Sequence, residues 1–334
     1  MTERRIYINA AQQVSIQRPL SDSWLDSPVD YPHDGGCQAA IDPDFKAFLA
    51  PMEARRMGRL LKRAVAVSDT VLAEAYVSDP DAILTATGLG CVENTEAFLN
   101  ALCEEGEDVM MPTAFMQSTH NTIGSLLAIR RKCHGYNSTY AHKGVSFESA
   151  LLDAVVQLRL GAVSNALVGA FDEMTPTYFG FLAKTGFVGQ PGMVRASDSA
   201  VAMVLSAVPA EKVLCELMDV RLMYRPAAGK VASYIMEQEG VDAIVAGING
   251  SEKNDKIYEE IASATCLPVM GYKHLFGENY GASAAGVYSA VRCLHSGRFA
   301  SLHAGEMALP EIRSVAVVNH DGRSVSVVKL GSLC

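Results

Sequence analysis

The chain has 334 residues, of which 49% are hydrophobic and 19% are charged. This composition is typical of a globular protein with a large core and excludes a disordered chain. A net charge of −9 and a pI near 5.4 argue against nucleic-acid binding, which needs a basic face. No apolar run approaches the length of a membrane span, and the N-terminus lacks the apolar core of a signal peptide. We therefore expect a cytoplasmic protein with neither a membrane nor a nucleic acid as partner.

The cysteines form no CxxC pair and no close cluster with histidines, so we expect neither a zinc site nor a redox dithiol. Their apolar surroundings indicate reduced thiols, and no cofactor is expected. The eight positions are Cys37, Cys91, Cys103, Cys133, Cys215, Cys266, Cys293 and Cys334.

The chain contains one dense run of basic residues, and an acidic partner would have to bind at this run. We interpret this run as the solvated face of a helix, which is the usual role of such charges. Its members are Arg55, Arg56, Arg59, Lys62 and Arg63.

The first third of the chain alternates between extended and helical patterns. Residues 6–14 predict a strand, and residues 52–76 predict one long helix. Between them, residues 20–42 form the main part of an irregular excursion that spans residues 15–50. Residues 81–102 then predict a strand, a glycine turn and a helix.

Residues 136–161 predict the corner of a nucleophile elbow, in which a strand meets a helix at a tight turn. The strand covers Tyr136 to Ala141, the turn covers residues 142–144, and Gly161 closes the helix. A buried strand follows at residues 165–170. Such corners hold a reactive side chain at the helix N-terminus, whose dipole stabilises anions. Here the turn carries His, Lys, Gly and Val, and no obvious nucleophile.

The second half of the chain repeats these patterns. Residues 242–261 repeat the strand, turn and helix of residues 81–102, and residues 271–297 repeat the corner. The helix at residues 282–294 is rich in Ala, Gly and Ser, so we expect it to be central and buried. A strand at residues 314–319 follows it. The chain therefore predicts two similar α/β halves, residues 1–195 and 196–334, joined by a loop-rich bridge at residues 174–197.

Five segments, in order along the chain, resemble motifs of the β-ketoacyl synthase family. They lie at residues 111–140, 160–173, 196–206, 273–286 and 317–328. The fourth segment, KHLFGENYGASAAG, is similar to that family's Lys-x-x-x-Gly-His motif. The resemblance implies a thiolase-like fold, with a duplicated and layered αβαβα architecture.

The resemblance also shows which catalytic groups this chain lacks. Family members use one cysteine and two histidines, and these positions fall here on Gly144, Gly247 and Glu278. A shifted alignment moves the cysteine position to His142, which is not a thiol either. The family's lysine is present as Lys273, but its usual glutamate partner is Val287. A glycine offers no side chain, and an ionised carboxylate donates no hydrogen bond, so the family's decarboxylative condensation is not expected.

Other polar residues near these positions have structural interpretations. Ser146 caps a helix, although it would be a nucleophile if His142 or His274 served as its base. Glu278 is expected to form an ion pair with Lys273 or to face a partner, although it would be a general base in altered chemistry. Cys133 is predicted to be a packed thiol, and the Glu173 side chain is predicted to bond to nearby backbone. Asn249 and Ser251, in a pattern that Asp255 completes, are predicted to hold their loop by bonds from side chain to backbone. His120 and Asn121 are predicted to cap a helix or to contact a partner.

Three functions remain open. We favour a non-catalytic subunit similar to a chain-length factor, which pairs with a competent ketosynthase in fatty-acid or polyketide-type biosynthesis. The alternative is an acyltransferase or acyl-thioester hydrolase that uses His142, Ser146, His274 or Glu278. A third hypothesis is a homodimer that binds an acyl group without reacting. The resemblance implies a homodimer or heterodimer through the strand Tyr136 to Ala141, with an acyl carrier protein as a further partner.

Overall fold

The computed structural model describes residues 4–105, 112–237, 240–302 and 311–333. Cys334 and the first residue of the segment at 111–140 lie outside this part of the chain. The main feature is a 10-stranded mixed sheet with the order β10-β9-β11-β12-β8-β1-β7-β5-β3-β4. Its strands are β1 (Ile6–Val14), β3 (Ala82–Ala86), β4 (Tyr136–Tyr140), β5 (Asn165–Asp172), β7 (Ser199–Ser206), β8 (Cys215–Tyr224), β9 (Ala243–Ala246), β10 (Val269–Gly271), β11 (Ser314–His320) and β12 (Ser324–Gly331).

The two ends of this sheet have the same design. The strands β4, β3 and β5 run parallel, and β7 and β1 follow in antiparallel pairing. At the other end β10, β9 and β11 run parallel, and β12 and β8 follow in antiparallel pairing. The two groups join where β1 pairs with β8. This mirrored order is what a duplicated α/β unit produces.

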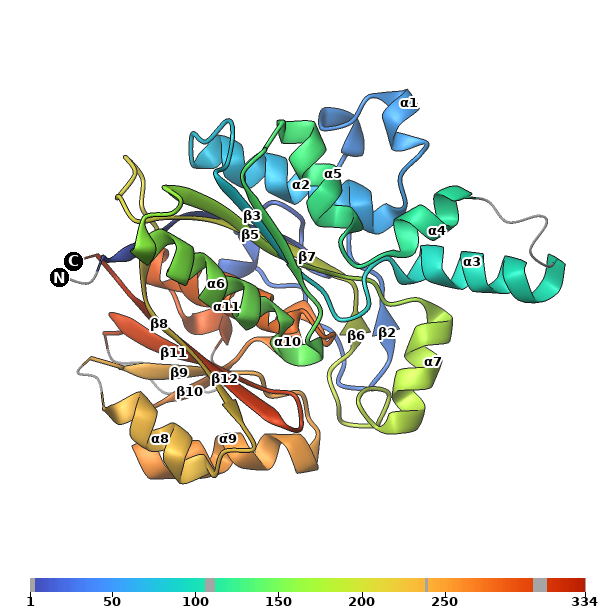
Figure 1. Ribbon diagram of the computed structural model, residues 1–334. Helices are drawn as coiled ribbons and strands as arrows, with labels where there is room; N and C mark the ends of the chain where they lie inside the picture. Colours follow the sequence, from blue (N-terminus) through green and yellow to red (C-terminus); the bar gives the residue numbers. More distant parts are fainter. Residues whose placement is uncertain (1–3, 106–111, 238–239, 303–310, 334) are drawn as a thin grey trace.

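Helices and sheet form alternating layers (Figure 1). The helices α2 (Arg59–Glu74) and α5 (Thr122–Arg131) cover one outer face, and α8 (Ala228–Met236) and α9 (Glu252–Thr265) cover the other. Between them lie α6 (Ser146–Leu160) and α11 (Ala282–Ser296), which contact each other. The remaining helices are α1 (Pro51–Ala54), α3 (Val92–Glu105), α4 (Pro112–Ser118), α7 (Pro176–Thr185) and α10 (Lys273–Phe276). The mixed α/β architecture agrees with the expected thiolase-like layering.

The central layer holds the largest apolar core. In α11 the small side chains of Ala284, Ala285 and Ala290 are almost fully buried, which confirms the prediction for this helix. In α6 the buried stripe contains Leu151, Ala154 and Leu158, as its helical spacing predicts. Gly161 follows α6 with φ +70°, the left-handed conformation that ends many helices.

Two predicted elements were wrong. Residues 52–76 are not one helix, because the chain is extended at Gly58 between α1 and α2. The segment at 174–197 contains the helix α7. Thr175 caps the start of this helix, because its side chain accepts a hydrogen bond from the Tyr178 N–H at 3.1 Å. Pro176 at the first helical position favours this helix start. The glycines further along the segment, which are typical of loops, outweighed this signal in the prediction.

The boundary between the halves follows from the mirrored strand order. The strand β7 pairs with both β5 and β1, so it belongs to the first group of strands. We therefore propose that the halves meet between Ser206 and Cys215 rather than between residues 195 and 196. Separately, none of the helices in the described residues is long and apolar enough to cross a membrane.

Candidate functional site

The elbow forms where it was predicted, between β4 and α6. A short 3-10 turn (Lys143–Val145) leads into α6, and Lys143 has φ +54°, which is unusual for a residue with a side chain. Gly144 is buried at the tip of this turn. The backbone therefore keeps the sharp geometry that presents a nucleophile at a helix N-terminus. The nucleophile itself is absent.

The space beside Gly144 is occupied by a residue from the other end of the chain. A Cβ atom built on Gly144 would lie 2.6 Å from the Cβ of Asp321, which follows β11. Real Cβ atoms do not approach so closely, so a cysteine at position 144 requires the turn between β11 and β12 to move. In addition, the Asn319 side-chain amide donates to the carbonyl oxygen of Gly144 at 3.1 Å.

Gly247, where the resemblance places the first histidine, is equally crowded. A Cβ atom there would lie 2.7 Å from Asn319 Oδ1, 2.9 Å from the Tyr258 hydroxyl and 3.0 Å from the Tyr272 hydroxyl. The Tyr272 hydroxyl donates to Asn319 Oδ1 at 3.3 Å, and the Tyr258 hydroxyl accepts the His320 N–H at 2.8 Å. Burial raises the pKa of both phenols well above the usual value, so both stay neutral. No histidine fits at position 247 without displacing these side chains.

Glu278, where the resemblance places the second histidine, is held in a buried ion pair. Its Oε2 accepts hydrogen bonds from Lys273 Nζ and from Asn249 Nδ2, both at 2.8 Å. The Lys273 and Glu278 side chains are 4% and 1% exposed. The predicted ion pair is therefore present. A carboxylate whose accepting oxygen is already shared by an ammonium and an amide is poorly placed to act as a general base.

No imidazole among the described residues contacts the candidate nucleophile Ser146. Its hydroxyl accepts the His142 N–H at 2.7 Å and points its proton at backbone carbonyl oxygens, those of Lys143 at 2.7 Å and Thr87 at 2.9 Å. The His142 ring contacts Ser149 at 3.0 Å, and His274 Nε2 lies 3.3 Å from the Ser301 carbonyl oxygen. Ser146 is thus a structural hydroxyl, although it satisfies the turn rather than the N-cap position.

The other predicted contacts divide into confirmed and wrong ones. Glu173 accepts N–H groups from Leu60 and Glu93, and the Cys133 thiol donates to the Pro80 carbonyl oxygen at 3.0 Å. The Asn249 side chain holds its loop by accepting the Ser251 N–H, and the Asp255 carboxylate accepts the N–H groups of Asn249 and Gly250. The Ser251 side chain, in contrast, makes no capping bond to α9. Asn121 stands at the start of α5 without a side-chain cap, and His120 is exposed.

The basic run is only partly a solvated face. Arg55, Arg56 and Arg59 are exposed, but Arg63 is 1% exposed. Its guanidinium donates to Asp42 at 2.5 Å and to Asp198 at 2.8 Å. The prediction was therefore wrong for Arg63, because two acidic residues distant in sequence converge on it.

The sequence did not single out the residues that fill the site, namely Asn319, Asp321, Tyr258 and Tyr272. Asn319 and Asp321 lie in the fifth motif, and Tyr272 directly precedes Lys273 of the fourth, but neither motif indicated that these side chains would fill the site. Tyr258 belongs to α9, and only the packing of the two halves brings Asn319 and Asp321 to the elbow.

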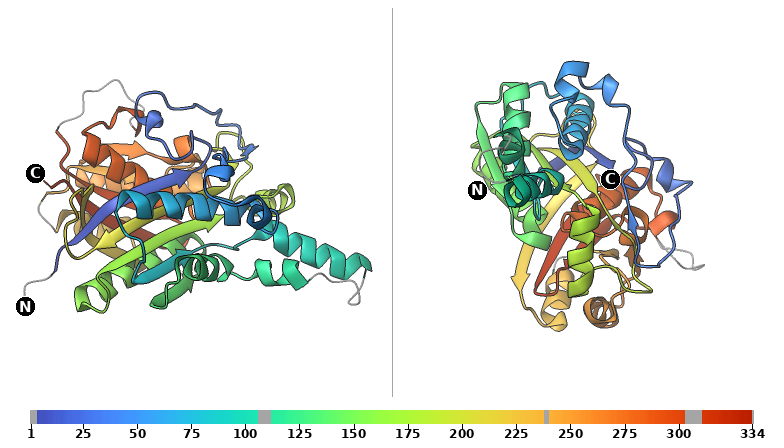
Figure 2. Two further views of the ribbon diagram at one scale, coloured as in Figure 1. Left: turned by 90° about the horizontal axis from the view of Figure 1, so that it is seen from above. Right: turned by 90° about the vertical axis from the view of Figure 1, so that its right-hand side faces the viewer.

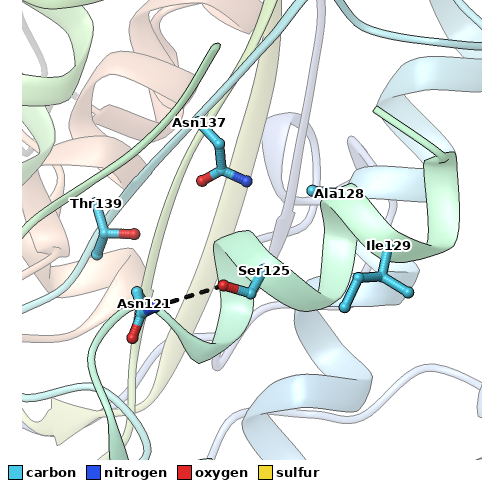
Figure 3. Close-up of a pocket in the computed structure, with 6 residues that line it drawn as sticks. All are labelled: Asn121, Ser125, Ala128, Ile129, Asn137 and Thr139. Atoms are coloured by element: carbon cyan, nitrogen blue, oxygen red, sulfur yellow. Dashed lines mark hydrogen bonds between the residues drawn. The ribbon is translucent and has the colours of Figure 1, made fainter. Parts of the chain in front are cut away.

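A separate feature is the free edge of the sheet at β4. Tyr136 N–H bonds to Asp81 and the Tyr140 carbonyl oxygen accepts from Thr87, so these residues face β3. Because backbone groups alternate along a strand, those of Asn137 and Thr139 point to the open edge. A cavity of about 500 Å³ lies between β4 and α5. Figure 3 shows Asn137 and Thr139 on the strand facing Ser125 on the helix and Asn121 just before it.

Comparison with known proteins gives the family. The profile of "Beta-ketoacyl synthase, N-terminal domain" matches residues 33–247, more than half of the chain. Among curated proteins, no match is found. The layered fold and the elbow define a thiolase-like protein. The chain belongs to the β-ketoacyl synthase family.

Solved structures share this fold over whole chains at low sequence identity. The chain described as the ishigamide ketosynthase/chain length factor is 16% identical with a TM-score of 0.83, and the match covers 100% of both chains. A β-ketoacyl synthase from Burkholderia phymatum STM815 is 14% identical with a TM-score of 0.80, covering 99% of this chain and 100% of that one. A chain of AntDE:AntF, a type II PKS acyl-carrier protein in complex with its ketosynthase bound to the hexaketide, is 13% identical with a TM-score of 0.78, again covering 99% and 100%.

Proposed function

We propose that this protein is a chain-length-factor-like subunit of fatty-acid or polyketide-type biosynthesis, which has no condensing activity of its own and works beside a competent ketosynthase. One observation carries the proposal. At Gly144 and Gly247, where the resemblance places the cysteine and the first histidine, neighbouring residues fill the space beside the backbone, and Glu278 stands where the resemblance places the second histidine. Loss of the thiolate and of both histidines removes the nucleophile and the donors that stabilise an enolate.

The direct test uses the purified chain with acyl-loaded and malonyl-loaded carrier protein. Alone, it yields no β-ketoacyl product. With a ketosynthase encoded beside it, product forms and its chain length depends on which subunit is present. Robust turnover by the chain alone would contradict the proposal.

The open edge of β4 supports pairing with a second thiolase-like chain. Exposed edge strands with free backbone groups are templates for strand addition. Exposed apolar side chains continue from this edge along α5 and α4: Ile129 is 77% exposed, Met116 68% and Phe115 55%. The helices α3 and α4 project from the body as an arm (Figure 2). We propose that the partner ketosynthase, or a second copy, pairs with β4 and covers these side chains.

The substitution Thr139→Pro tests this interface, because it removes an N–H that points to the open edge and leaves the N–H groups facing β3. Thr139→Ala is the matched control, since both variants lose the hydrogen bond of 2.8 Å to Thr85. Light scattering at micromolar concentration, with and without the ketosynthase, is expected to show a dimer for the Ala variant and a monomer for the Pro variant. Dimers of equal stability would place the interface elsewhere.

An acyl carrier protein is the further partner that we propose, and the exposed arginines of the basic run are its binding surface. Arg56 lines a cavity of about 530 Å³ between α1, α4 and α5, and Arg55 is its exposed neighbour in sequence. In a chain of net charge −9, this is where an acidic carrier meets positive charge. Charge reversal at both arginines is expected to weaken carrier binding at least tenfold at low salt, whereas Lys253→Glu on α9 leaves it unchanged. Equal effects of both would indicate a non-specific charge effect.

The alternative enzyme requires acylation of Ser146. The hydroxyl proton points at carbonyl oxygens, and no imidazole among the described residues contacts it. Intact mass spectrometry after incubation with acyl thioesters is expected to show an unmodified chain. We also propose a cytoplasmic location, which the free thiols of Cys37, Cys103 and Cys266 on the surface support and cell fractionation tests.

A further inference from the structure

The altered centre contains a second buried carboxyl group, which the proposed function does not use. Glu148 lies in the first turn of α6, four residues after Gly144, and is 1% exposed. Its Oε1 accepts a hydrogen bond from the Ser326 hydroxyl of β12 at 2.7 Å. Ser283 of α11 faces the same carboxyl group. Glu148 therefore stands where a helix of the first half meets a helix and a strand of the second.

Too few positive charges are buried here for two ionised carboxyl groups. Lys273 is the cation that acts on Glu148, but its ammonium group is bonded to Glu278 at 2.8 Å. Glu148 also interacts with the phenols of Tyr258 and Tyr272, and neither of these groups is cationic. A buried carboxylate without a bonded cation is far less stable than the neutral acid.

The surrounding hydrogen-bonding groups accommodate the neutral acid. Glu148 Oε2 and Ser283 Oγ are both buried, and both lack a hydrogen-bond partner among the described residues. Protonated Oε2 would be a donor, and Ser283 Oγ is an available acceptor facing it. With Ser326 donating to Oε1, both oxygens of the acid would then be satisfied.

We propose that Glu148 is protonated and uncharged in the folded protein at neutral pH, and that its carboxyl group joins α6 to β12 and α11. The centre that has lost its catalytic groups then serves as a polar junction between the two halves of the fold. Burial raises the pKa of this carboxyl group, in agreement with the geometry. A carboxyl group with a raised pKa stabilises the folded protein fully when the pH is below its ordinary pKa near 4. This stabilisation is lost as the pH rises through the pKa of the folded state.

Glu148→Gln and Glu148→Ala form the decisive pair. Glutamine reproduces the neutral acid, with a carbonyl oxygen for Ser326 and an amide donor for Ser283, whereas alanine removes both bonds and leaves a cavity. Urea unfolding at pH 4 is expected to give the Gln variant a midpoint equal to that of the unchanged chain and the Ala variant a clearly lower one. As the pH rises from 4 to 9, the unchanged chain is expected to become less stable than the Gln variant, because its unfolded state releases a proton that its folded state keeps and glutamine has no such proton.

Infrared spectra provide a readout that a purely structural role would not change. The difference between the unchanged chain and Glu148→Gln at pH 7 is expected to contain the carbonyl stretching band of a protonated carboxylic acid. A carboxylate band instead, or a Gln variant destabilised at every pH, would overturn the proposal. Both measurements use the isolated chain, so their outcome is independent of whether it acts as a chain-length-factor-like subunit.

Discussion

The side-chain amide of Asn319 donates to the backbone carbonyl oxygen of Gly144, 3.1 Å away and 175 residues distant in sequence. The same side chain accepts the hydroxyl of Tyr272 at 3.3 Å. One amide therefore ties the elbow of the first half to β11 and to the residue before α10 in the second. The elbow that would carry a nucleophile has become a contact between the halves.

Replacing Asn319 with alanine is expected to lower the free energy of unfolding by about 1–3 kcal/mol, because the Tyr272 hydroxyl and the Gly144 carbonyl oxygen lose their buried partner. Denaturant unfolding measures this change. Asn100→Ala on the exposed face of α3 is the control and is expected to have little effect. Equal effects at both positions would mean that the amide bridge adds no stability.

Gly144→Ala is expected to destabilise the protein by about 1–3 kcal/mol, since its Cβ would meet Asp321 at 2.6 Å. Gly180→Ala in α7 is the matched control, because a Cβ there meets nothing within 4 Å, and alanine favours a helix. Thermal unfolding compares the two.

For the same reason, restoring a cysteine at position 144 is expected to give no condensing activity. Assays with malonyl-loaded carrier protein check this result. If Gly144→Cys folded normally and formed β-ketoacyl product, Asp321 would not be an obstacle.

Lys273→Ala is expected to cost about 3–5 kcal/mol of stability, because Glu278 is left as a buried and unpaired charge. The double variant Lys273→Met with Glu278→Gln removes both charges and is expected to recover most of the loss. Chemical unfolding of the single and double variants gives the coupling. A double variant as unstable as the single one would show that packing, and not charge, determines the loss.

Asp172→Asn is expected to reduce the pH dependence of stability. Burial raises the pKa of Asp172 to about 7, and its Oδ2 has no hydrogen-bond partner among the described residues. Because this pKa is raised, the contribution of Asp172 to the free energy of unfolding is complete below pH 4 and is lost as the pH rises through about 7. Thermal unfolding between pH 4 and 8 is therefore expected to show a smaller decline for the variant. Parallel curves for the two proteins would contradict the raised pKa.

Local signals in the sequence were sufficient for most of the fold. Strand β1 was predicted with its observed bounds, and the elbow from β4 to α6 formed as expected, because hydrophobic period and glycine turns act within a few residues. The helix break at Gly58 and the start of α7 at Pro176 were missed where glycine and proline signals competed with a helical pattern.

The sequence by itself predicted that the family's catalytic positions fall on Gly144, Gly247 and Glu278, because motifs and their spacing are visible without a structure. Only the tertiary structure decided what surrounds these positions. Asn319 and Asp321 reach the elbow from the far end of the chain, and Arg63 is buried because Asp42 and Asp198 converge on it. Such contacts depend on how the two halves pack, and no local pattern of residues encodes them.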